Sequence, residues 1–255
     1  MVNLIDFTGK TIIVTGASSG IGRETAILLS KLGAKLIIIA RNKEKLRDTI
    51  NSLDGEGHAD IAFDLTSFSE YNHLFSRIFE NGSRVSGFVH CAGFSKTIPL
   101  RNMKLNDLDE MMKINYYSFM LLAKEFVKKK NVDPDGASIV AISSVAGDFS
   151  VKGKSIYSAT KSSLNISVKA LAQEYAQWNI RFNTISPGWV RTELTDKATQ
   201  ALTSERVENV IENHPLGPGD PIDVAKTVAF LLSDAARWIT GTTLIIDGGA
   251  TTKAG

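Results

Sequence analysis

Cysteine, net charge and long apolar runs are all scarce in this sequence, and each scarcity excludes a class of protein. Cys91 is the one cysteine among 255 residues, which excludes a disulfide within the chain and a zinc site built on cysteines. The 29 basic and 27 acidic residues leave a formal net charge of only +2, which argues against binding to nucleic acid or to an anionic membrane. Apolar runs such as residues 36–40 are much shorter than the ~20 residues of a membrane-spanning helix.

Signals for targeting and for metal binding are missing as well. Residues 1–10 lack the cationic segment and the long apolar run of a signal peptide, so we expect a cytoplasmic protein. His58, His73 and His214 share no spacing typical of metal ligands, so we expect no metal.

Seven short apolar segments alternate with longer segments in which apolar residues recur at helical spacing. The expected strands are residues 11–15, 36–40, 59–64, 87–90, 138–143, 181–186 and 243–246. The expected helices are residues 21–32, 43–53, 67–81, 105–130, 156–177 and 222–232. Largely apolar strands separated by helices are typical of a parallel sheet covered on both faces. We therefore expect an α/β fold: one doubly wound domain of Rossmann type with a seven-stranded parallel sheet.

This single domain is expected to span residues 1–255, because no segment resembles a linker between domains. Residues 192–221 have mixed character and contain Pro215, Gly217, Pro218 and Gly219 near their end. They could form a substrate-binding flap over a site, or simply a surface helix with a turn.

A glycine-rich turn follows the first expected strand and precedes the first expected helix. It runs from Thr15 to Gly22, and its glycines are spaced as Gly-x-x-x-Gly-x-Gly. Glycines let the backbone approach a pyrophosphate, whose charge the N-terminal amides of the helix stabilise. Glycine turns after strands are common, but this context favours a dinucleotide site.

Two charged residues end the next strands. A carboxylate at the end of the second strand would bind the adenosine ribose of NAD, but Arg41 follows that strand instead. Its guanidinium could pair with the 2′-phosphate of NADP, or with Glu44 as an ordinary surface pair. We favour the phosphate and hence NADP(H). Asp64 could accept a hydrogen bond from the adenine amino group, or merely cap the next helix.

Tyr157 and Lys161 are four residues apart in an expected helix, so they project from the same face. A cation beside a phenol favours phenolate and lowers its pKa from about 10. Such a phenol suits proton transfer to a developing alkoxide, or from an alcohol. Pairs of this kind also occur by chance on helix surfaces, so the surroundings must decide.

Six landmarks in order along the chain resemble the short-chain dehydrogenase/reductase family. They are the turn from Thr15 to Gly22, Asp64, the strand end from His90 to Gly93, Asn115, Ser144 with Tyr157 and Lys161, and Pro187-Gly188 followed by Thr192. The resemblance covers essentially the whole chain. It implies an NADP(H)-dependent oxidoreductase that moves hydride reversibly between nicotinamide and a ketone or secondary alcohol.

The resemblance also assigns roles to residues. Tyr157 would be the acid/base, Ser144 would hydrogen-bond the substrate oxygen, and Asn115 would support a proton relay leading to Lys161. Ser143 would be structural, although the two serines could exchange roles. The resemblance implies the following cofactor contacts: Gly16, Ser18, Ser19, Gly20, Ile21, Gly22, Arg41, Asp64, Leu65, His90, Ala92, Gly93, Tyr157, Lys161, Pro187, Gly188, Val190 and Thr192.

The strand end departs from the family pattern Asn-Asn-Ala-Gly, because His90 and Cys91 replace the two asparagines. Gly93 keeps room for a cofactor. His90 could supply the hydrogen bond of the first asparagine, or be a core histidine with its polar atoms satisfied, which we favour slightly. Cys91 is expected to be buried and inert.

The closest family resemblance is to 3-oxoacyl-acyl-carrier-protein reductases, which act in fatty acid synthesis. An acidic carrier protein needs a basic docking surface, and Trp178, Asp133 and Asp135 argue against one, although the run 128–130 of lysines could compensate. An apolar approach to the site is expected from Phe149, Val151, Trp189, Leu194 and Leu202. A small-molecule carbonyl or alcohol is therefore the expected substrate. A non-catalytic NADP-binding redox sensor or scaffold is the alternative from another class, and a homotetramer, or a dimer, is implied by the resemblance.

Overall fold

The computed structural model describes residues 4–149, 151–193, 195, 208 and 211–252. Its seven strands are β1 (Thr11–Thr15), β2 (Lys35–Ala40), β3 (Ala59–Ala62), β4 (Gly87–His90), β5 (Ala137–Ile142), β6 (Ile180–Pro187) and β7 (Thr243–Ile246). They form one parallel sheet in the order β3-β2-β1-β4-β5-β6-β7. The doubly wound α/β fold with seven parallel strands is therefore confirmed.

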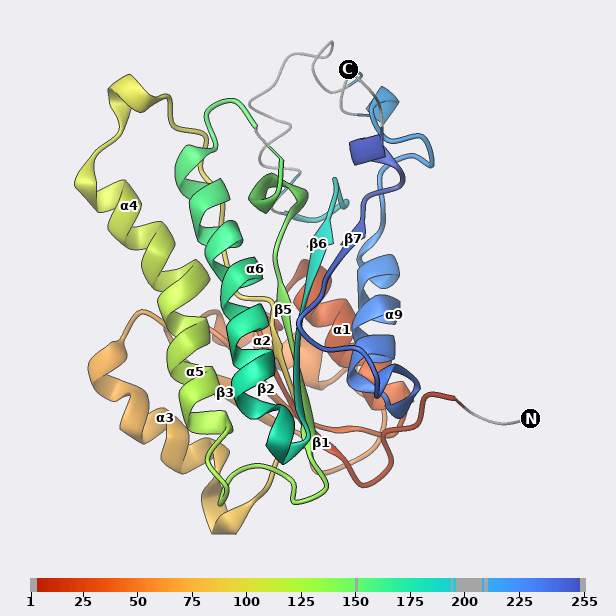
Figure 1. The fold of residues 1–255 in the computed structure, drawn as a ribbon. Helices are drawn as coiled ribbons and strands as arrows, with labels where there is room; N and C mark the ends of the chain where they lie inside the picture. Colours follow the sequence, from red (N-terminus) through yellow and green to blue (C-terminus); the bar gives the residue numbers. More distant parts are fainter. Residues whose placement is uncertain (1–3, 150, 194, 196–207, 209–210, 253–255) are drawn as a thin grey trace.

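Helices cover both faces of the sheet, as Figure 1 shows. The helices α1 (Gly20–Lys31), α2 (Lys43–Ile50) and α9 (Pro221–Leu232) pack on one face, around a core that includes Leu29, Leu46 and Val228. The helices α3 (Tyr71–Ile78), α5 (Ser118–Phe126) and α6 (Ser155–Tyr175) pack on the other, where Leu74, Phe119 and Leu164 are buried. The strands are apolar on both sides because both sides are covered.

The expected helix over residues 105–130 is divided in the structure. It consists of α4 (Leu105–Met112), a π-helical turn η4 (Lys113–Tyr117) and α5, and it ends at Phe126. π-turns inside α-helices insert one residue and occur frequently at functional sites. Here the inserted turn contains Asn115.

The order of the strands reverses between β1 and β4, and the connections from these two strands lead to opposite faces. In open α/β sheets, ligands bind outside the carboxyl ends of the strands at such a point. In Figure 1 these carboxyl ends point upward.

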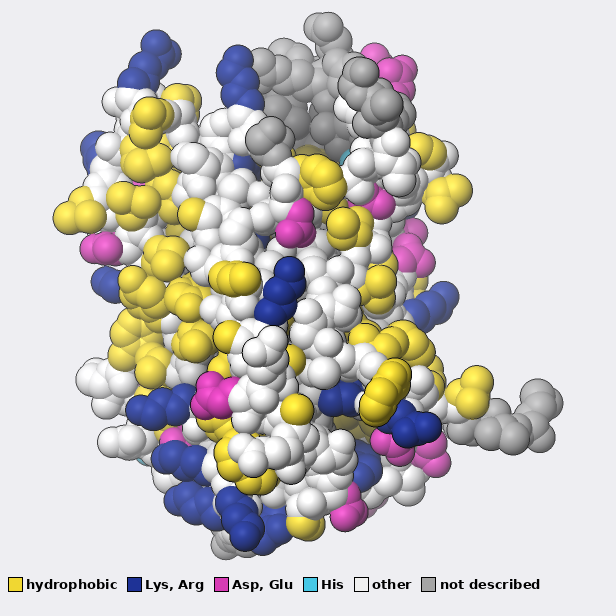
Figure 2. All heavy atoms as spheres, in the orientation of Figure 1, with side chains coloured by type: hydrophobic (Ala, Val, Ile, Leu, Met, Phe, Trp, Pro, Cys, Tyr) yellow, Lys and Arg dark blue, Asp and Glu magenta, His cyan; other side chains and the backbone are white. Residues whose placement is uncertain are grey.

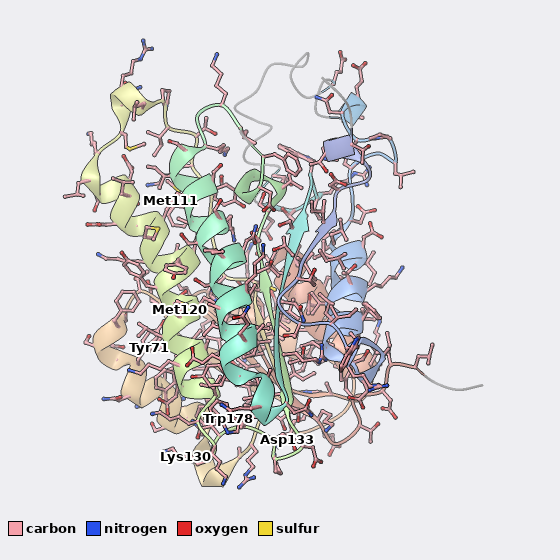
Figure 3. All side chains as sticks on the ribbon, in the orientation of Figure 1. Tyr71, Met111, Met120, Lys130, Asp133 and Trp178 are labelled. Atoms are coloured by element: carbon pink, nitrogen blue, oxygen red, sulfur yellow. The ribbon has the colours of Figure 1, made fainter. Side chains whose placement is uncertain are left out.

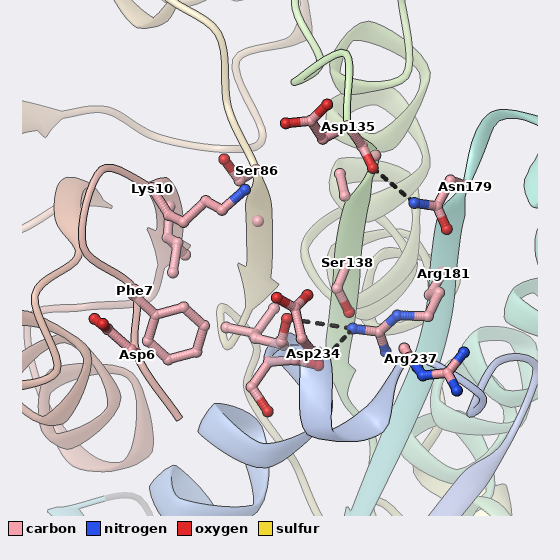
Figure 4. A pocket seen from close by; sticks show the side chains of 16 residues that line it. Asp6, Phe7, Lys10, Ser86, Asp135, Ser138, Asn179, Arg181, Asp234 and Arg237 are labelled. Carbon is pink, nitrogen blue, oxygen red and sulfur yellow. Dashed lines mark hydrogen bonds between the residues drawn. The ribbon is translucent and has the colours of Figure 1, made fainter. Parts of the chain in front are cut away.

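The opposite, amino end of the sheet carries a separate pocket of about 350 Å³, shown in Figure 4. There the Arg181 guanidinium donates hydrogen bonds to the carbonyls of Leu231, Leu232 and Ser233. These carbonyls end α9, so the cation satisfies them and suits the negative end of the helix dipole. Arg181 thus ties α9 to β6.

Candidate active site

A cavity of about 590 Å³ lies at the carboxyl ends of the strands, above the reversal point between β1 and β4. Its walls are Gly16, Ser18, Ser19, Gly20, Ile21, Gly22, Ala40, Arg41, Asn42, Phe63, Leu65, Cys91, Ala92, Gly93, Phe94, Ile114, Ile142, Thr192 and Glu193. Eleven of these residues were expected to contact a cofactor: Gly16, Ser18, Ser19, Gly20, Ile21, Gly22, Arg41, Leu65, Ala92, Gly93 and Thr192. The fold thus brings most of the sequence-based set together, with Asp64 and His90 as exceptions.

The glycine turn is built so that the backbone can be approached closely. A Cβ atom at Gly16, where φ is +68°, would lie 2.8 Å from the backbone nitrogen of Ala92. A Cβ at Gly22 would lie 2.3 Å from the carbonyl oxygen of Gly16. Only glycine fits at either place, and the turn leads directly into the N-terminus of α1 after Ser19. This cradle fits the pyrophosphate of a dinucleotide.

The far end of the cavity is bordered by Arg41 and Asn42 after β2. Arg41 is exposed, and in the described part of the chain it forms no ion pair with Glu44, so the surface-pair alternative is not what the structure has. Asn42 caps α2 by accepting a hydrogen bond from the Lys45 amide at 2.9 Å. Lys45 in turn pairs with Glu193 across the cavity edge at 2.5 Å. The guanidinium therefore stands free for an anionic ligand.

Asp64 does not line the cavity, although Phe63 and Leu65 on either side of it do. Its Oδ1 accepts hydrogen bonds from the Thr66 amide at 2.9 Å and the Thr66 hydroxyl at 2.8 Å. These are the bonds of a local turn, whereas the sequence had suggested an adenine contact or a helix cap, and the residue before the next helical turn is Ser67.

A smaller cavity of about 130 Å³ adjoins the large one and contains the reactive side chains. The two share Ile21, Cys91, Gly93, Phe94, Ile142 and Thr192. The smaller one is completed by Ser143, Ser144, Tyr157, Lys161, Pro187, Gly188, Val190 and Thr195. The helix α6 positions Tyr157 and Lys161, and the Lys161 Nζ lies 5.7 Å from the centre of the phenol ring. Phenol and ammonium thus face the same space, as the spacing predicted.

The two serines after β5 have different surroundings. Ser144 hydrogen-bonds the Tyr157 side chain and accepts a hydrogen bond from the Ala146 amide at 3.2 Å. Ser143 is buried and donates its hydroxyl to the Lys161 carbonyl at 3.2 Å. Ser144 therefore belongs with the phenol, while Ser143 holds α6 against the sheet.

The pKa of Tyr157 corrects one expectation. Burial raises the pKa of this phenol above its usual value, and the hydrogen bond with Ser144 opposes that rise. We expected the Lys161 cation to lower it. However, the Nζ of Lys161 donates to the Ile142 carbonyl at 2.7 Å, and burial lowers the pKa of Lys161 to about 8. Burial therefore raises the pKa of the phenol and lowers the pKa of the ammonium group, because it disfavours the charged form of each.

Asn115 is fully buried in the π-turn and bonds the loop after β4. Its Oδ1 accepts from the Phe94 amide at 3.0 Å, and its Nδ2 donates to the Phe94 carbonyl at 3.0 Å. The Nδ2 also donates to Thr160 Oγ1 at 3.0 Å. Asn115 thus joins the β4 loop to α6, one residue before Lys161.

His90 is a core histidine rather than a side chain facing the cavity. It is fully buried, its Nδ1 lies 3.0 Å from Thr15 Oγ1, and its Nε2 lies 3.4 Å from Ser118 Oγ. Burial lowers its pKa to about 3, so the ring is neutral. The expected direct contact with a cofactor is wrong for the side chain of this residue, because it has no exposed surface. Cys91 is partly buried, and burial raises the pKa of its thiol to about 12, which makes it unreactive as a nucleophile.

Several cavity residues escaped sequence reasoning. Phe63, Phe94 and Ile114 line the large cavity, and Ile142 lines both. Phe63 and Ile142 stand next to recognised residues at strand ends, a signal that could have identified them. Leu194 and Leu202, expected in the apolar approach, lie outside the described residues, as do residues 196–207 of the flap region. Phe149 and Val151 are 44% and 45% exposed, and Trp189 is partly buried.

The residues invoked against a carrier protein lie at the wrong end of the molecule. Asp133 accepts a hydrogen bond from Ser86, just before β4, and Asp135 lines the amino-end pocket of Figure 4. Figure 3 places Lys130, Asp133 and Trp178 together at the lower end, opposite the cavity. That part of the sequence-based argument is wrong, because these residues do not border the site entrance.

Comparison with known proteins places the chain in a family. A family model described as enoyl-(acyl carrier protein) reductase matches residues 16–251. A solved short-chain type dehydrogenase/reductase from Mycobacterium ulcerans is 30% identical with a TM-score of 0.88, over 98% of this chain and 93% of that one. The chain therefore belongs to the short-chain dehydrogenase/reductase family, and it is an oxidoreductase that acts on a carbonyl/alcohol pair with a nicotinamide cofactor.

Two curated relatives are similar over nearly their whole length. The 3-oxoacyl-acyl-carrier-protein reductase of Rickettsia typhi is 38% identical over 248 residues, which are 96% of this chain and 98% of the relative. Carbonyl reductase family member 4 of Danio rerio is 34% identical over 238 residues, 93% of this chain and 96% of the relative.

Among the described residues, no helix combines the length and apolar character needed to cross a membrane.

Proposed function

We propose that this protein is an NADP(H)-dependent reductase that interconverts a ketone and a secondary alcohol, with Tyr157 as acid/base. One observation carries the proposal: Ser144, Tyr157 and Lys161 line a small cavity that shares six wall residues with the larger cavity above the glycine turn. A dinucleotide bound along the large cavity would have its reactive end beside the phenol. The bound cofactor supplies the hydride; the chain positions the ketone and manages the proton.

The roles follow from the surroundings of each group. The hydroxyls of Ser144 and Tyr157 would both donate to the ketone oxygen and stabilise the charge that develops there, a contribution of about 3–4 kcal/mol per donor in comparable sites. Tyr157 would then deliver its proton. Its raised pKa keeps the phenol protonated at neutral pH, which suits reduction. Lys161, still largely charged below pH 8, would stabilise the phenolate left behind and bind the nicotinamide ribose.

We further propose that NADP(H) is the preferred cofactor. Arg41 follows β2, has no carboxylate partner among the residues that the structure describes, and would pair with a 2′-phosphate. Pro187, Gly188, Val190 and Thr192 border the small cavity and would contact the nicotinamide end. Asn115 would support a proton relay to Lys161, since it fixes the segment from Phe94 and bonds Thr160.

We also propose the extent of the domain, the assembly and the cellular site. The whole chain would act as one cytoplasmic domain, with residues 192–221 as a flap over the substrate. Leu105, Leu108, Tyr117 and Ile166 expose 73%, 37%, 43% and 64% of their surface. Figure 2 shows hydrophobic side chains gathered over the side of α4 and α5. Such a patch supports association into a dimer or homotetramer.

A second substrate class has support of its own. The Rickettsia typhi relative is named for 3-oxoacyl-acyl-carrier-protein, and its 38% identity extends over 96% of this chain. A 3-oxoacyl thioester is therefore the alternative to a free small-molecule ketone. A non-catalytic cofactor-binding sensor is disfavoured because the serine, tyrosine, lysine and asparagine are all in place.

The test is turnover with NADPH against diketones, quinones and 3-oxoacyl thioesters, for the natural protein and for Tyr157→Phe. Tyr157→Phe should keep NADPH affinity and lower kcat by about 10²- to 10⁴-fold, the usual worth of a general acid. Tyr175→Phe, at the other end of the same helix, is the matched control and should not change kcat. Tight NADPH binding without oxidation by any of these ketones would favour the sensor instead.

A further inference from the structure

Lys154 is a partly buried lysine beside the catalytic phenol, on the turn that leads into α6. Its Nζ donates a hydrogen bond to Ser95 Oγ at 2.8 Å and lies 5.9 Å from the centre of the Tyr157 ring. The Nζ of Lys161 lies 5.7 Å from the same centre. Two ammonium groups therefore lie near one phenol, and the roles assigned above account for only one of them.

No carboxylate in the described part of the chain forms an ion pair with Lys154, and its hydrogen-bond partner Ser95 is neutral. Burial alone lowers the pKa of this lysine, with no negative group acting against it. Lys96, the residue directly after Ser95, is different: it pairs with Asp107 and with Glu110. Among the described residues, the neighbouring exposed lysine thus has two acidic partners and the partly buried one has none.

The local structure makes a cation at this position costly. Lys154 is the N-cap residue of α6, a helix of 21 residues, and its side chain forms no capping hydrogen bond. Serine, threonine, aspartate and asparagine are preferred at such positions. The positive end of the helix dipole also repels a lysine. A negative group beside the Nζ would offset both the burial and the repulsion.

The backbone around Lys154 is fixed before any substrate arrives. The carbonyl of Gly153 accepts a hydrogen bond from the Ile98 amide at 2.8 Å, and the Lys154 amide donates to Val151 at 3.0 Å. A Cβ at Gly153 would lie 2.8 Å from Thr97 Cγ2, so the two loops pack closely. A preorganised ammonium group loses little entropy on binding an anion.

We propose that Lys154 binds a carboxylate of the substrate, so that the ketones reduced best are short oxo acids. This rests on the proposed function and narrows it. The carboxylate pairs with the Nζ of Lys154 while the ketone oxygen of the same molecule faces Tyr157 and Ser144. A thioester or ester lacks that charge and forms the weaker contact.

Matched substrates and variants test the charge. The substrates are 3-oxobutanoate and its ethyl ester, and the variants are Lys154→Met, Lys154→Arg and the control Lys152→Met, which removes an exposed lysine two residues away. A charge-assisted pair predicts that Lys154→Met lowers kcat/KM for the acid by about 10- to 100-fold, mainly through KM. The ester should change by less than about threefold, as expected for loss of a contact it does not make. Lys154→Arg should retain part of the preference for the acid, and Lys152→Met all of it.

The inference is overturned if Lys154→Met lowers kcat/KM equally for acid and ester, because the lysine would then act on Tyr157 and not on substrate charge. It is also overturned if the natural protein shows no preference for the acid. If that protein still reduces neutral ketones, only the inference fails and the proposed function stands. Calorimetry of butanoate and butanamide with the NADP⁺-loaded protein tests the inference separately from the proposed function. Butanoate binding that Lys154→Met abolishes supports the inference even without turnover, and equal binding of acid and amide contradicts it.

Discussion

The Nδ1 atom of His90 lies 3.0 Å from the Thr15 hydroxyl, which joins the ends of β4 and β1 beneath the cofactor cavity. Thr15 Oγ1 also accepts a hydrogen bond from the Ala92 amide at 3.3 Å. The Thr15 hydroxyl therefore donates its proton to Nδ1 of His90. The Nε2 hydrogen of His90 then points to the Ser118 hydroxyl, which itself donates to the Ile114 carbonyl at 2.7 Å. A neutral histidine thus connects the Ala92 loop with the π-turn that carries Asn115.

This buried histidine should make the protein sensitive to acid. The pKa of His90 is about 3 in the folded protein and 6.5 in the unfolded chain. Between these values only the unfolded chain binds the proton, so the free energy of unfolding falls as pH drops from 6.5 toward 3, by up to about 1.4 kcal/mol per pH unit. His90→Asn should reduce that slope in urea unfolding at pH 4, 5, 6 and 7. The exposed His73→Asn is the control, and an unchanged slope for His90→Asn would contradict the prediction.

Lys161 should limit activity at alkaline pH. Its pKa is lowered to about 8, whereas the pKa of Tyr157 is raised, so between pH 8 and 10 the lysine loses its charge while the phenol keeps its proton. We expect kcat/KM for NADPH, which reports the free enzyme, to be constant below about pH 8 and to fall above it. The measurement is initial rates at saturating ketone from pH 6 to 10. A constant value up to pH 10 would show that the charge of Lys161 is not needed.

The sequence was a good guide where one local rule determines the structure. The expected strands agree with the observed ones within about two residues, since uninterrupted apolar runs of strand length can be buried in few other ways. The spacing of Tyr157 and Lys161 determined their common face for the same reason. The glycine turn was equally readable, because the contacts of Gly16 and Gly22 admit no side chain.

Features that depend on contacts between residues far apart in the sequence could not be predicted from the sequence. The π-turn at Asn115 is stabilised by hydrogen bonds to Phe94, 21 residues earlier, and nothing in the apolar spacing of residues 105–130 signals it. The lowered pKa of Lys161 arises from burial that a sequence does not give. The misplacement of Asp133 and Trp178 was avoidable. Both precede a strand, and segments that precede parallel strands lie at the amino end of the sheet, away from the site.

Arg41 should determine the choice of cofactor. Arg41 borders the cavity, and no described carboxylate pairs with it. Arg41→Asp would place a negative charge where a 2′-phosphate would lie and would instead suit a ribose hydroxyl. KM for NADPH should rise by about 10- to 100-fold, while KM for NADH should fall. Arg77→Asp makes the same change of charge on an exposed face of α3 and should alter neither. Equal KM changes for the two cofactors would show that Arg41 does not distinguish them.

Gly22 should be the least replaceable residue of the phosphate-binding turn. An alanine Cβ there would lie 2.3 Å from the Gly16 carbonyl oxygen, a backbone atom that can move only if the turn opens. Gly22→Ala should therefore abolish NADPH binding, measured by fluorescence titration, and should lower the melting temperature. Gly9→Ala is the comparison: φ is +78° at Gly9 but no atom lies within 4 Å of the added Cβ, so only the backbone conformation is strained, at about 1–2 kcal/mol. Gly9→Ala should bind NADPH normally. If Gly22→Ala bound NADPH as tightly as Gly9→Ala, the cradle around Gly16 would not be the binding site for the pyrophosphate.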